Sequence, residues 1–319
     1  MGISRRDLII CAGGALAASA LPARAAGTTV LSGPAFGTSW TLVAPSPLDE
    51  TVVRPAIEEI VSSVDAAMSP FRADSELTRF NRSPSTDWLP LSAPTLAVAE
   101  EALRIATSTG GAFNPTLGPL VGRYGFGPIK EGATGRADEI SVTEGAVRKA
   151  RSGLTLDFNG IAKGYALDRI AASCVALGVN DFLLELGGEV FADGRHPTGR
   201  RWQIGVERPS PEGSFQRVVA AEGAALATSG SAVNAYAWRG HRYAHIIDPA
   251  TGRPAAWPLA SVTVAAITGM TADALATALY AMGPERGPDF ASGASIEALF
   301  VMDDGREVVT AGFEKRILA

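Results

Sequence analysis

The stretch LDFNGIAKGYALDRIA, Leu156–Ala171, constrains the fold more than any other part of the sequence. It predicts the end of a strand over 153–160, a break at Gly160, and a helix with Lys163 in its first turn. Glycine permits backbone geometry that other residues resist, and the free amides at a helix start attract anions. Asp157 and Lys163 therefore flank a turn that suits an anionic ligand. A structural turn with a solvated lysine explains the same residues, since the stretch matches neither a Walker loop nor a GxGxxG motif.

The rest of the chain mixes strands and helices without regular alternation, internal repeat or linker, which favours an α+β fold in one large domain. Helices are predicted over 50–69, 93–111, from 162, and over 271–283 with Thr271 as N-cap and Asp273 in the first turn. Strands are predicted over 28–45 (paired or bulged at Phe36-Gly37-Thr38), 181–194, 202–209, 224–230, 242–254 and 260–267, with a hairpin over 297–315. The Gly- and Pro-rich segment 110–128 is expected to be an ordered loop that lines a site.

The N-terminus has the pattern of an export signal. Arg5 and Arg6 precede an apolar run over 8–21, and Ala23-Arg24-Ala25 forms a cleavage site. The run is shorter than the roughly 20 apolar residues of a membrane helix, and the paired arginines resemble the twin-arginine signal. We therefore expect residues 1–25 to be a signal peptide, 26–319 to be the functional domain, and the mature protein to be periplasmic without stable membrane insertion.

Two other interpretations of this segment remain open. It is either an amphipathic tail or, because Cys11 lies within it, a lipoprotein signal; Cys11 falls at the start of the apolar run rather than at its end. The only other cysteine, Cys174, is expected to be a small buried residue, so no disulfide framework is available. A formal net charge of -5 with scattered Lys and Arg argues against nucleic-acid binding.

Three residues in the C-terminal half are candidates for chemistry. His245 lies in RYAHIIDPATGRP and has a reference pKa near neutrality, which suits a general acid or base. Asp273 and Thr277 are four residues apart and share one face of a helix, where their oxygens suit Mg²⁺. The alternatives are a core histidine and an aspartate that only complements the helix dipole.

Two further motifs allow either a binding or a structural role. Gly187 and Gly188 in LLELGGEV let the backbone approach a ligand or a neighbouring strand. Thr228, Ser229 and Gly230 offer hydroxyl and amide donors at a strand end, or form an ordinary turn.

Taken in order, the segments resemble the FAD:protein FMN transferase family, also called the flavin transferase or thiamine-biosynthesis lipoprotein family. The resemblance rests on GPAFGTSW, MSPFRADSELTRFN, GGAFNPTLGPLVGRYGFGP, LDFNGIAKGYALD, LLELGGEV, ATSGS, HIIDPATGRP and TADALATALYAMG. These segments cover nearly the whole of the chain after the leader. The resemblance implies a T-fold-like domain with an antiparallel sheet and packed helices.

The resemblance also implies an activity and a set of site residues. Such an enzyme binds FAD and Mg²⁺, splits the pyrophosphate, and joins FMN to a Thr or Ser hydroxyl of an acceptor protein in an exported electron-transfer complex, with release of AMP. The FAD contacts carried over are Phe36, Ala112, Phe113, Asn114, Asp157, Lys163, Ser229, Gly230, His245 and Ile247. The metal ligands carried over are Asp273, Thr277 and the backbone carbonyl of Gly160, with His245 and Asp273 as catalytic residues.

Two positions depart from the family pattern, which has Met at Phe36 and Asp at Asn114. Phe36 keeps an apolar contact, whereas Asn114 lacks a charge. The same residues would also serve a Mg²⁺-dependent FAD pyrophosphatase that uses water, and a non-catalytic flavin-delivery factor is a further alternative. The sequence carries no copy of the family's acceptor pattern, so the acceptor is expected to be another protein.

Overall fold

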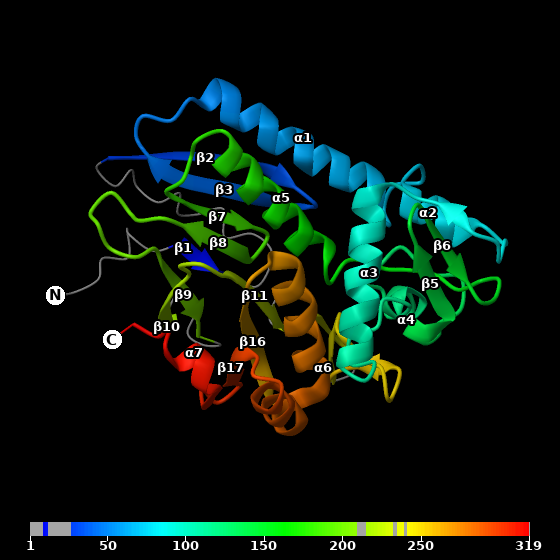
Figure 1. The fold of residues 1–319 in the computed structure, drawn as a ribbon. Helices are drawn as coiled ribbons and strands as arrows, with labels where there is room; N and C mark the ends of the chain where they lie inside the picture. Colours follow the sequence, from blue (N-terminus) through cyan, green and yellow to red (C-terminus); the bar gives the residue numbers. More distant parts are fainter. Residues whose placement is uncertain (1–8, 12–26, 209–214, 232–234, 239–240, 319) are drawn as a thin grey trace.

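An eight-stranded antiparallel sheet forms the centre of the protein (Figure 1). The computed structural model describes residues 9–11, 27–208, 215–231, 235–238 and 241–318. The strand order is β18-β17-β16-β11-β8-β7-β3-β2, so the N- and C-terminal hairpins form opposite edges. The strands are β2 (Thr28–Ala35), β3 (Thr38–Pro45), β7 (Phe182–Leu186), β8 (Glu189–Asp193), β11 (Ala225–Gly230), β16 (Leu259–Ala266), β17 (Glu297–Met302) and β18 (Glu307–Val309).

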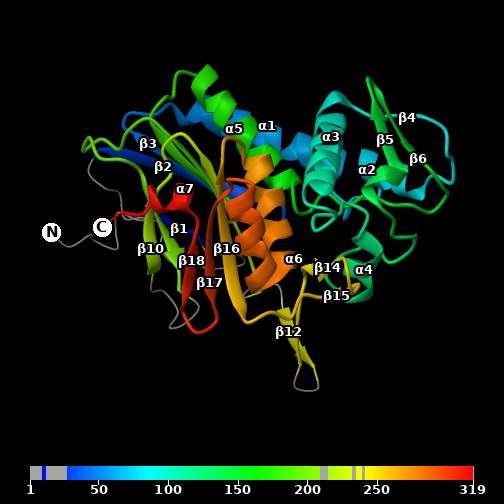
Figure 2. The same ribbon diagram turned by 60° about the horizontal axis from the view of Figure 1, so that its bottom comes forward.

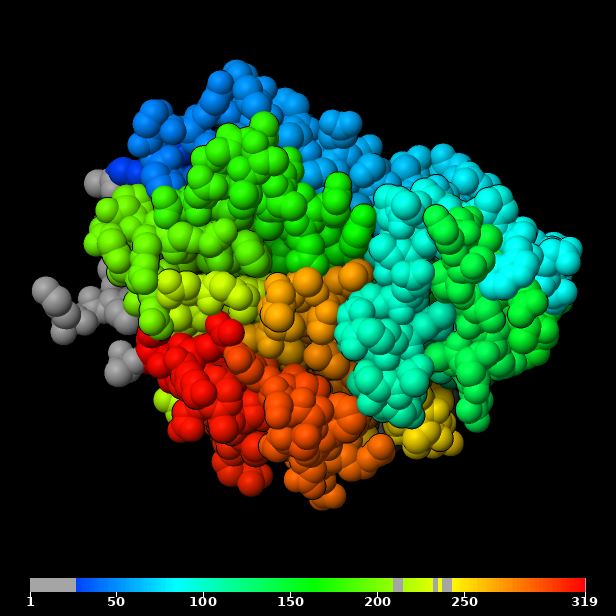
Figure 3. All heavy atoms as spheres, viewed as in Figure 1, coloured from blue at the N-terminus to red at the C-terminus, as the bar shows by residue number. Residues whose placement is uncertain are grey.

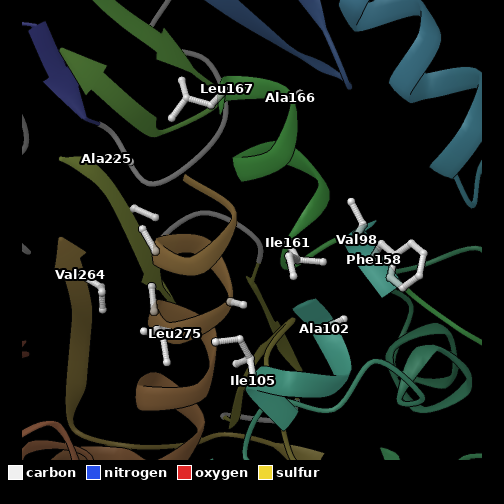
Figure 4. Close-up of a cluster of buried hydrophobic side chains, with 14 of the residues drawn as sticks. Val98, Ala102, Ile105, Phe158, Ile161, Ala166, Leu167, Ala225, Val264 and Leu275 are labelled. Atoms are coloured by element: carbon white, nitrogen blue, oxygen red, sulfur yellow. The ribbon is translucent and has the colours of Figure 1, made fainter. Parts of the chain in front are cut away.

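Three long helices cover one face of this sheet. They are α1 (Glu50–Met68) over β2, α5 (Ala162–Ala176) over β7 and β8, and α6 (Gly269–Gly293) over β11 and β16. Figure 4 shows apolar side chains of α5, α6 and the strands, among them Leu167, Leu275 and Val264, while Ile105 of α3 (Ala93–Ser108) lies on the side of α6 away from β16. Burial of this apolar surface is the main force that holds the helices on the sheet.

A second apolar core lies on the other side of the sheet. It contains side chains of β9 (Gln203–Glu207), β10 (Phe215–Ala220) and α7 (Ala311–Glu314). β1 (Ile9–Cys11) pairs in parallel with β9. The central strands are therefore buried on both faces, in keeping with their almost continuous apolar sequence.

A smaller lobe lies beside α6 (Figure 2). It contains α2 (Glu76–Arg82), α3 (Ala93–Ser108), α4 (Gly118–Arg123), η2 (Ala137–Glu139), β4 (Leu89–Pro90), β5 (Ile140–Thr143) and β6 (Ala146–Lys149). Two small hairpins follow nearby, β12 (Ala235–Trp238) with β13 (His241–Ala244), and β14 (Ile247–Asp248) with β15 (Arg253–Pro254). Figure 3 shows the surface of α3, with the β14–β15 segment below it, beside the surface formed by α6.

The predicted α+β class, antiparallel sheet and packed helices are confirmed, but the predicted strand over 153–160 is wrong. This segment has a single bridge, from Leu154 to Ala133. Side chains satisfy its backbone instead: Asn81 Oδ1 accepts from the Leu156 amide at 2.7 Å, and Asn81 Nδ2 donates to the Leu156 carbonyl at 2.8 Å. Lys149 Nζ donates to the Leu154 carbonyl at 3.1 Å. The alternating apolar side chains are buried, but no neighbouring strand lies alongside them in the described part of the chain.

Other boundaries also differ from the sequence prediction. The single strand predicted over 181–194 is the β7–β8 hairpin, because Gly187 and Gly188 turn the chain with φ of 58° and 104°. The N-cap of α6 is Thr268, whose side chain accepts from the Thr271 amide, so Asp273 lies in the second turn rather than the first. The predicted helix end at Gly283 is a kink with φ of 82°, after which α6 continues.

The predicted turn at Phe36-Gly37 is a two-residue hairpin connection between β2 and β3, with φ of 49° and 76°. The predicted signal peptide, 1–25, lies outside the described residues except for β1. Within the described residues, no helix combines the length and the apolar character needed to cross a bilayer.

Candidate active site

The first turns of α5 and α6 contact each other backbone to backbone. A Cβ atom at Gly164 would lie 2.1 Å from the carbonyl oxygen of Gly269, so only glycine permits this approach. The contact places Asp273, one turn into α6, against the start of α5. Asp273 Oδ2 accepts a hydrogen bond from the Gly164 amide at 3.2 Å, although the two residues are 109 positions apart. The carboxylate is 4% exposed.

Thr277 lies one turn further along α6, and three other predicted site residues lie close to it. Its Oγ1 is 3.3 Å from Ser229 Oγ at the end of β11. A Cβ at Gly160 would lie 3.2 Å from Thr277 Oγ1 and 3.3 Å from Phe113 Cε2. The structure therefore brings Phe113, Gly160, Ser229 and Thr277 to one place beside Asp273.

Lys163 connects this place to the β7–β8 turn. Its Nζ donates to Glu189 Oε1 at 2.6 Å and to the Gly187 carbonyl at 3.4 Å. Glu185, on the same turn, accepts from the Gly188 amide at 2.8 Å. The lysine side chain is 31% exposed, whereas that of Glu189 is 3% exposed.

Charge is unbalanced around this lysine. Burial raises the pKa of Glu189 to about 8, with Lys163 opposing and Asp273 reinforcing the shift. Burial also raises the pKa of Asp273 and of Glu185. Burial disfavours the charge on Lys163, but the three carboxylates outweigh it and raise its pKa. A single ammonium does not balance three buried carboxylates, so this region favours either protons on the carboxyl groups or a further cation.

The start of α5 offers fewer free amides than the sequence predicts. The Ala162 amide donates to the Phe158 carbonyl at 2.8 Å, and the Gly164 amide is taken by Asp273. Lys163 is therefore the main contribution of this helix start to anion binding. At the start of α6, Asp168 accepts from the Gly269 and Met270 amides at 2.6 and 3.0 Å.

The predicted flavin loop is held largely by its own hydrogen bonds. Asn114 Nδ2 donates to the Gly135 carbonyl at 2.9 Å, while its Oδ1 accepts from the Thr116 amide and hydroxyl at 2.9 and 2.8 Å. An aspartate could not donate the first of these bonds, which explains structurally why asparagine is suited to position 114 in this chain. Asp157 Oδ1 accepts from the Asn159 amide at 2.9 Å, and burial raises its pKa. Ala112 packs against the main core.

Four other predicted residues lie around this group rather than within its hydrogen bonds. Phe36 packs partly buried on the main core, and the backbone of Gly230 lies close to Ala260 in β16. His245 precedes β14, a strand that contacts α6, and its ring meets Phe126 edge-on with centroids 6.4 Å apart. Ile247, within β14, is 4% exposed.

This arrangement matches known proteins along most of the chain. The model of the ApbE family matches residues 36–300. The chain belongs to the ApbE family. It is 35% identical to the FAD:protein FMN transferase of Vibrio cholerae over 89% of this chain and 91% of that protein. It is 32% identical to the FAD:protein FMN transferase of Escherichia coli over 87% and 85%.

Solved ApbE structures share the fold. The flavin transferase ApbE from Vibrio cholerae superposes with a TM-score of 0.81 at 33% identity, over 91% of this chain and 99% of that chain. The apo flavinyl transferase ApbE from Pseudomonas stutzeri gives a TM-score of 0.82 at 32% identity, over 92% and 97%. The resemblance drawn from the sequence segments is thereby confirmed.

The metal prediction for this ApbE-family chain depends on a small donor set. The described residues contain no group of three or more His, Cys, Asp and Glu that could hold a metal ion. The candidate ligands are instead one carboxylate, one hydroxyl and one carbonyl, from Asp273, Thr277 and Gly160. This all-oxygen set fits Mg²⁺, which usually keeps several waters and takes one or two carboxylates. Even a methyl group at Gly160 would make a tight contact with Thr277 Oγ1, at 3.2 Å.

Three residues of this ApbE-family site are not predicted by the sequence patterns. Glu185 and Glu189 flank the two glycines of LLELGGEV, and two acidic residues in an otherwise apolar strand were the available signal. Gly164 follows Lys163 directly, but nothing local in the sequence shows that it meets a second helix.

Proposed function

We propose that this protein is a Mg²⁺-dependent FAD:protein FMN transferase that attaches FMN to a Thr or Ser hydroxyl of an acceptor protein and releases AMP. One observation carries the proposal. In a chain of the ApbE family, one place contains Asp273 and Thr277 of α6, Lys163 of α5, and Gly160 of the turn before α5. The hydrogen bond from the Gly164 amide to Asp273 joins the two helices across 109 positions of the sequence.

Each residue has a defined part in this reaction. Asp273, Thr277 and the Gly160 carbonyl would hold Mg²⁺, which supplies charge neutralisation at the phosphates when bound. Lys163 lies beside them and binds a phosphate oxygen as a point charge. Phosphoryl transfer depends mainly on such positioning and charge stabilisation.

His245 is the proposed general base. The acceptor hydroxyl oxygen bonds to the phosphorus of the FMN half, the bond from this phosphorus to the bridging oxygen breaks, and AMP leaves with that oxygen. The hydroxyl proton passes to His245. Phe36, Phe113 and Ile247 provide apolar surface for the flavin, and Asp157 the polar contact at the turn.

The test is to incubate the purified protein with FAD, Mg²⁺ and a redox protein encoded beside its gene. The expected product is a fluorescent, covalently flavinylated acceptor band, with one AMP released per flavin attached. AMP release without labelled acceptor would identify a pyrophosphatase instead. If the protein binds FAD but forms neither flavinylated acceptor nor AMP, the result would indicate a flavin-delivery factor and contradict the proposal.

We further propose a periplasmic location, reached by the twin-arginine route. The support is the Arg5-Arg6 pair ahead of the apolar run and the cleavage pattern at 23–25. Replacing both arginines with lysine should leave the precursor in the cytoplasm, as measured by cell fractionation and immunoblot. Unchanged periplasmic levels would contradict this route.

A further inference from the structure

Glu189 has no part in the chemistry described above, yet it is among the most buried carboxylates of the site. Only 3% of its side chain is exposed, and Oε1 accepts from Lys163 Nζ at 2.6 Å. Burying a carboxylate is costly even when it is paired, so such an ion pair is weak evidence for a contribution to stability. Stability alone therefore does not account for the place of Glu189 beside Lys163.

The turn that carries Glu189 is fixed by its own bonds. The Gly188 amide donates to Glu185 Oε1 at 2.8 Å, and the Gly187 amide donates to the Ser39 carbonyl at 3.1 Å. Gly187 has φ of 58°, and a Cβ there would lie 2.7 Å from Thr38 Cγ2. Glu189 thus projects from a turn that has little freedom to move.

The environment of the second carboxylate oxygen of Glu189 indicates a role other than stabilising the fold. Oε2 is buried and has no hydrogen-bond partner within the described residues. Leaving a buried acceptor unsatisfied costs about 1–3 kcal/mol. Glutamine would relieve the buried charge here, but its amide oxygen would hold the lysine more weakly than a carboxylate does.

Lys163 needs such a restraint. Its ammonium sits on a flexible four-carbon stem, and its side chain is 31% exposed. Without Glu189 the ammonium is free to extend into solvent. With Glu189 and the Gly187 carbonyl as acceptors, it stays on the side of the site that contains Asp273.

We propose that Glu189 is a positioning residue that holds the Lys163 ammonium at the phosphate-binding place of the site. This inference rests on the proposed function. Glu189 acts only through Lys163 and does not touch the reacting atoms. Once the lysine is removed, the identity of residue 189 should no longer affect the reaction.

A double-mutant cycle of Lys163→Met, Glu189→Gln and the double variant tests this, with FAD, Mg²⁺ and the acceptor protein as substrates and AMP release as the readout. Glu189→Gln should weaken FAD binding and lower kcat/KM on the order of 10- to 100-fold, as for outer partners that orient a reactive group. The double variant should be no slower than Lys163→Met alone. Fully additive losses would show that Glu189 acts separately from the lysine and would overturn the proposal.

Two more variants separate positioning from folding. Glu189→Asp keeps the charge and should recover part of the lost kcat/KM, which a purely steric role would not explain. Glu297→Gln breaks another short carboxylate–cation pair, with Arg316 at 2.5 Å, outside the site, in which the glutamate is 35% exposed. This control should retain kcat/KM within about twofold of the wild type while losing an ion pair. Equal losses in Glu189→Gln and Glu297→Gln would overturn the proposal.

The cycle also has a readout that does not require turnover. FAD affinity, measured by quenching of flavin fluorescence, should show the same non-additivity between positions 163 and 189. A wild type that binds FAD but releases no AMP would refute the proposed function while leaving this cycle interpretable. Additive effects on affinity as well would refute the positioning role.

Discussion

The glycine contact between α5 and α6 can be tested by adding one methyl group. In Gly164→Ala, the new Cβ would lie 2.1 Å from the Gly269 carbonyl oxygen, 2.4 Å from its carbon and 2.7 Å from the Met270 nitrogen. All three atoms are backbone, so no side chain can turn away. A normal carbon–oxygen contact of about 3.3 Å requires the helices to separate by roughly 1 Å.

The expected loss of stability follows from two effects. Overpacking of this kind costs about 1–3 kcal/mol. The bond from the Gly164 amide to Asp273, already 3.2 Å long, would be lost at a further cost of about 1.5–3 kcal/mol. The better helix propensity of alanine returns up to about 1 kcal/mol. The net loss of about 1.5–6 kcal/mol corresponds to a fall in Tm on the order of 3–12 °C for a chain of this size.

Thermal unfolding followed by circular dichroism measures this loss, and AMP release from FAD reports the displaced Asp273. Gly293→Ala is the matched control, because it lies in the same helix α6 and a Cβ there meets nothing within 4 Å. The control should keep its activity and its Tm, or gain slightly. Gly164→Ala with a Tm within 1 °C of the wild type and full activity would refute the close helix contact.

Three further predictions follow from the same region. Asp273→Asn should abolish Mg²⁺-dependent AMP release while the protein still unfolds cooperatively; activity that survives excess EDTA would contradict the metal assignment. Burial raises the pKa of Asp168 from its ordinary 3.8 to about 6, although its two amide donors oppose this shift. The contribution of the protonated carboxyl to stability is therefore present below pH 3.8 and is lost as the pH rises through 6. The unfolding free energy of Asp168→Asn in urea should therefore rise relative to wild type between pH 4 and 7, and a constant difference would contradict this. Burial also raises the pKa of the Cys174 thiol to about 11, so a thiol reagent should label it only after unfolding; rapid labelling of the native protein would contradict its 1% exposure.

The sequence predicts those parts of the site that depend on local geometry. The helix after Gly160 and the shared face of Asp273 and Thr277 follow from glycine and from the helical repeat, and the structure contains both. The expected buried, unpaired state of Cys174 is likewise confirmed. Such features need only neighbours within a turn or two.

The features that the sequence does not predict depend on distant partners. The contact of Gly164 with Gly269 and the pairing of Lys163 with Glu189 join segments whose proximity follows only from the sheet order. For the segment 153–160, the sequence instead predicts a strand that the structure does not contain. Its alternating apolar residues are buried as in a strand, but the backbone of Leu156 and Leu154 bonds to the side chains of Asn81 and Lys149 instead of to a neighbouring strand.

The meeting of Gly164 and Asp273 also sets an order of events during synthesis. The ribosome makes the lysine-bearing helix first, and the carboxylate follows 109 residues later. Until then a nascent chain presents the lysine without the carboxylate that is proposed to hold Mg²⁺, so under the proposed function it would not yet cleave FAD. Completion of the catalytic centre is in this way delayed until most of the polypeptide has emerged.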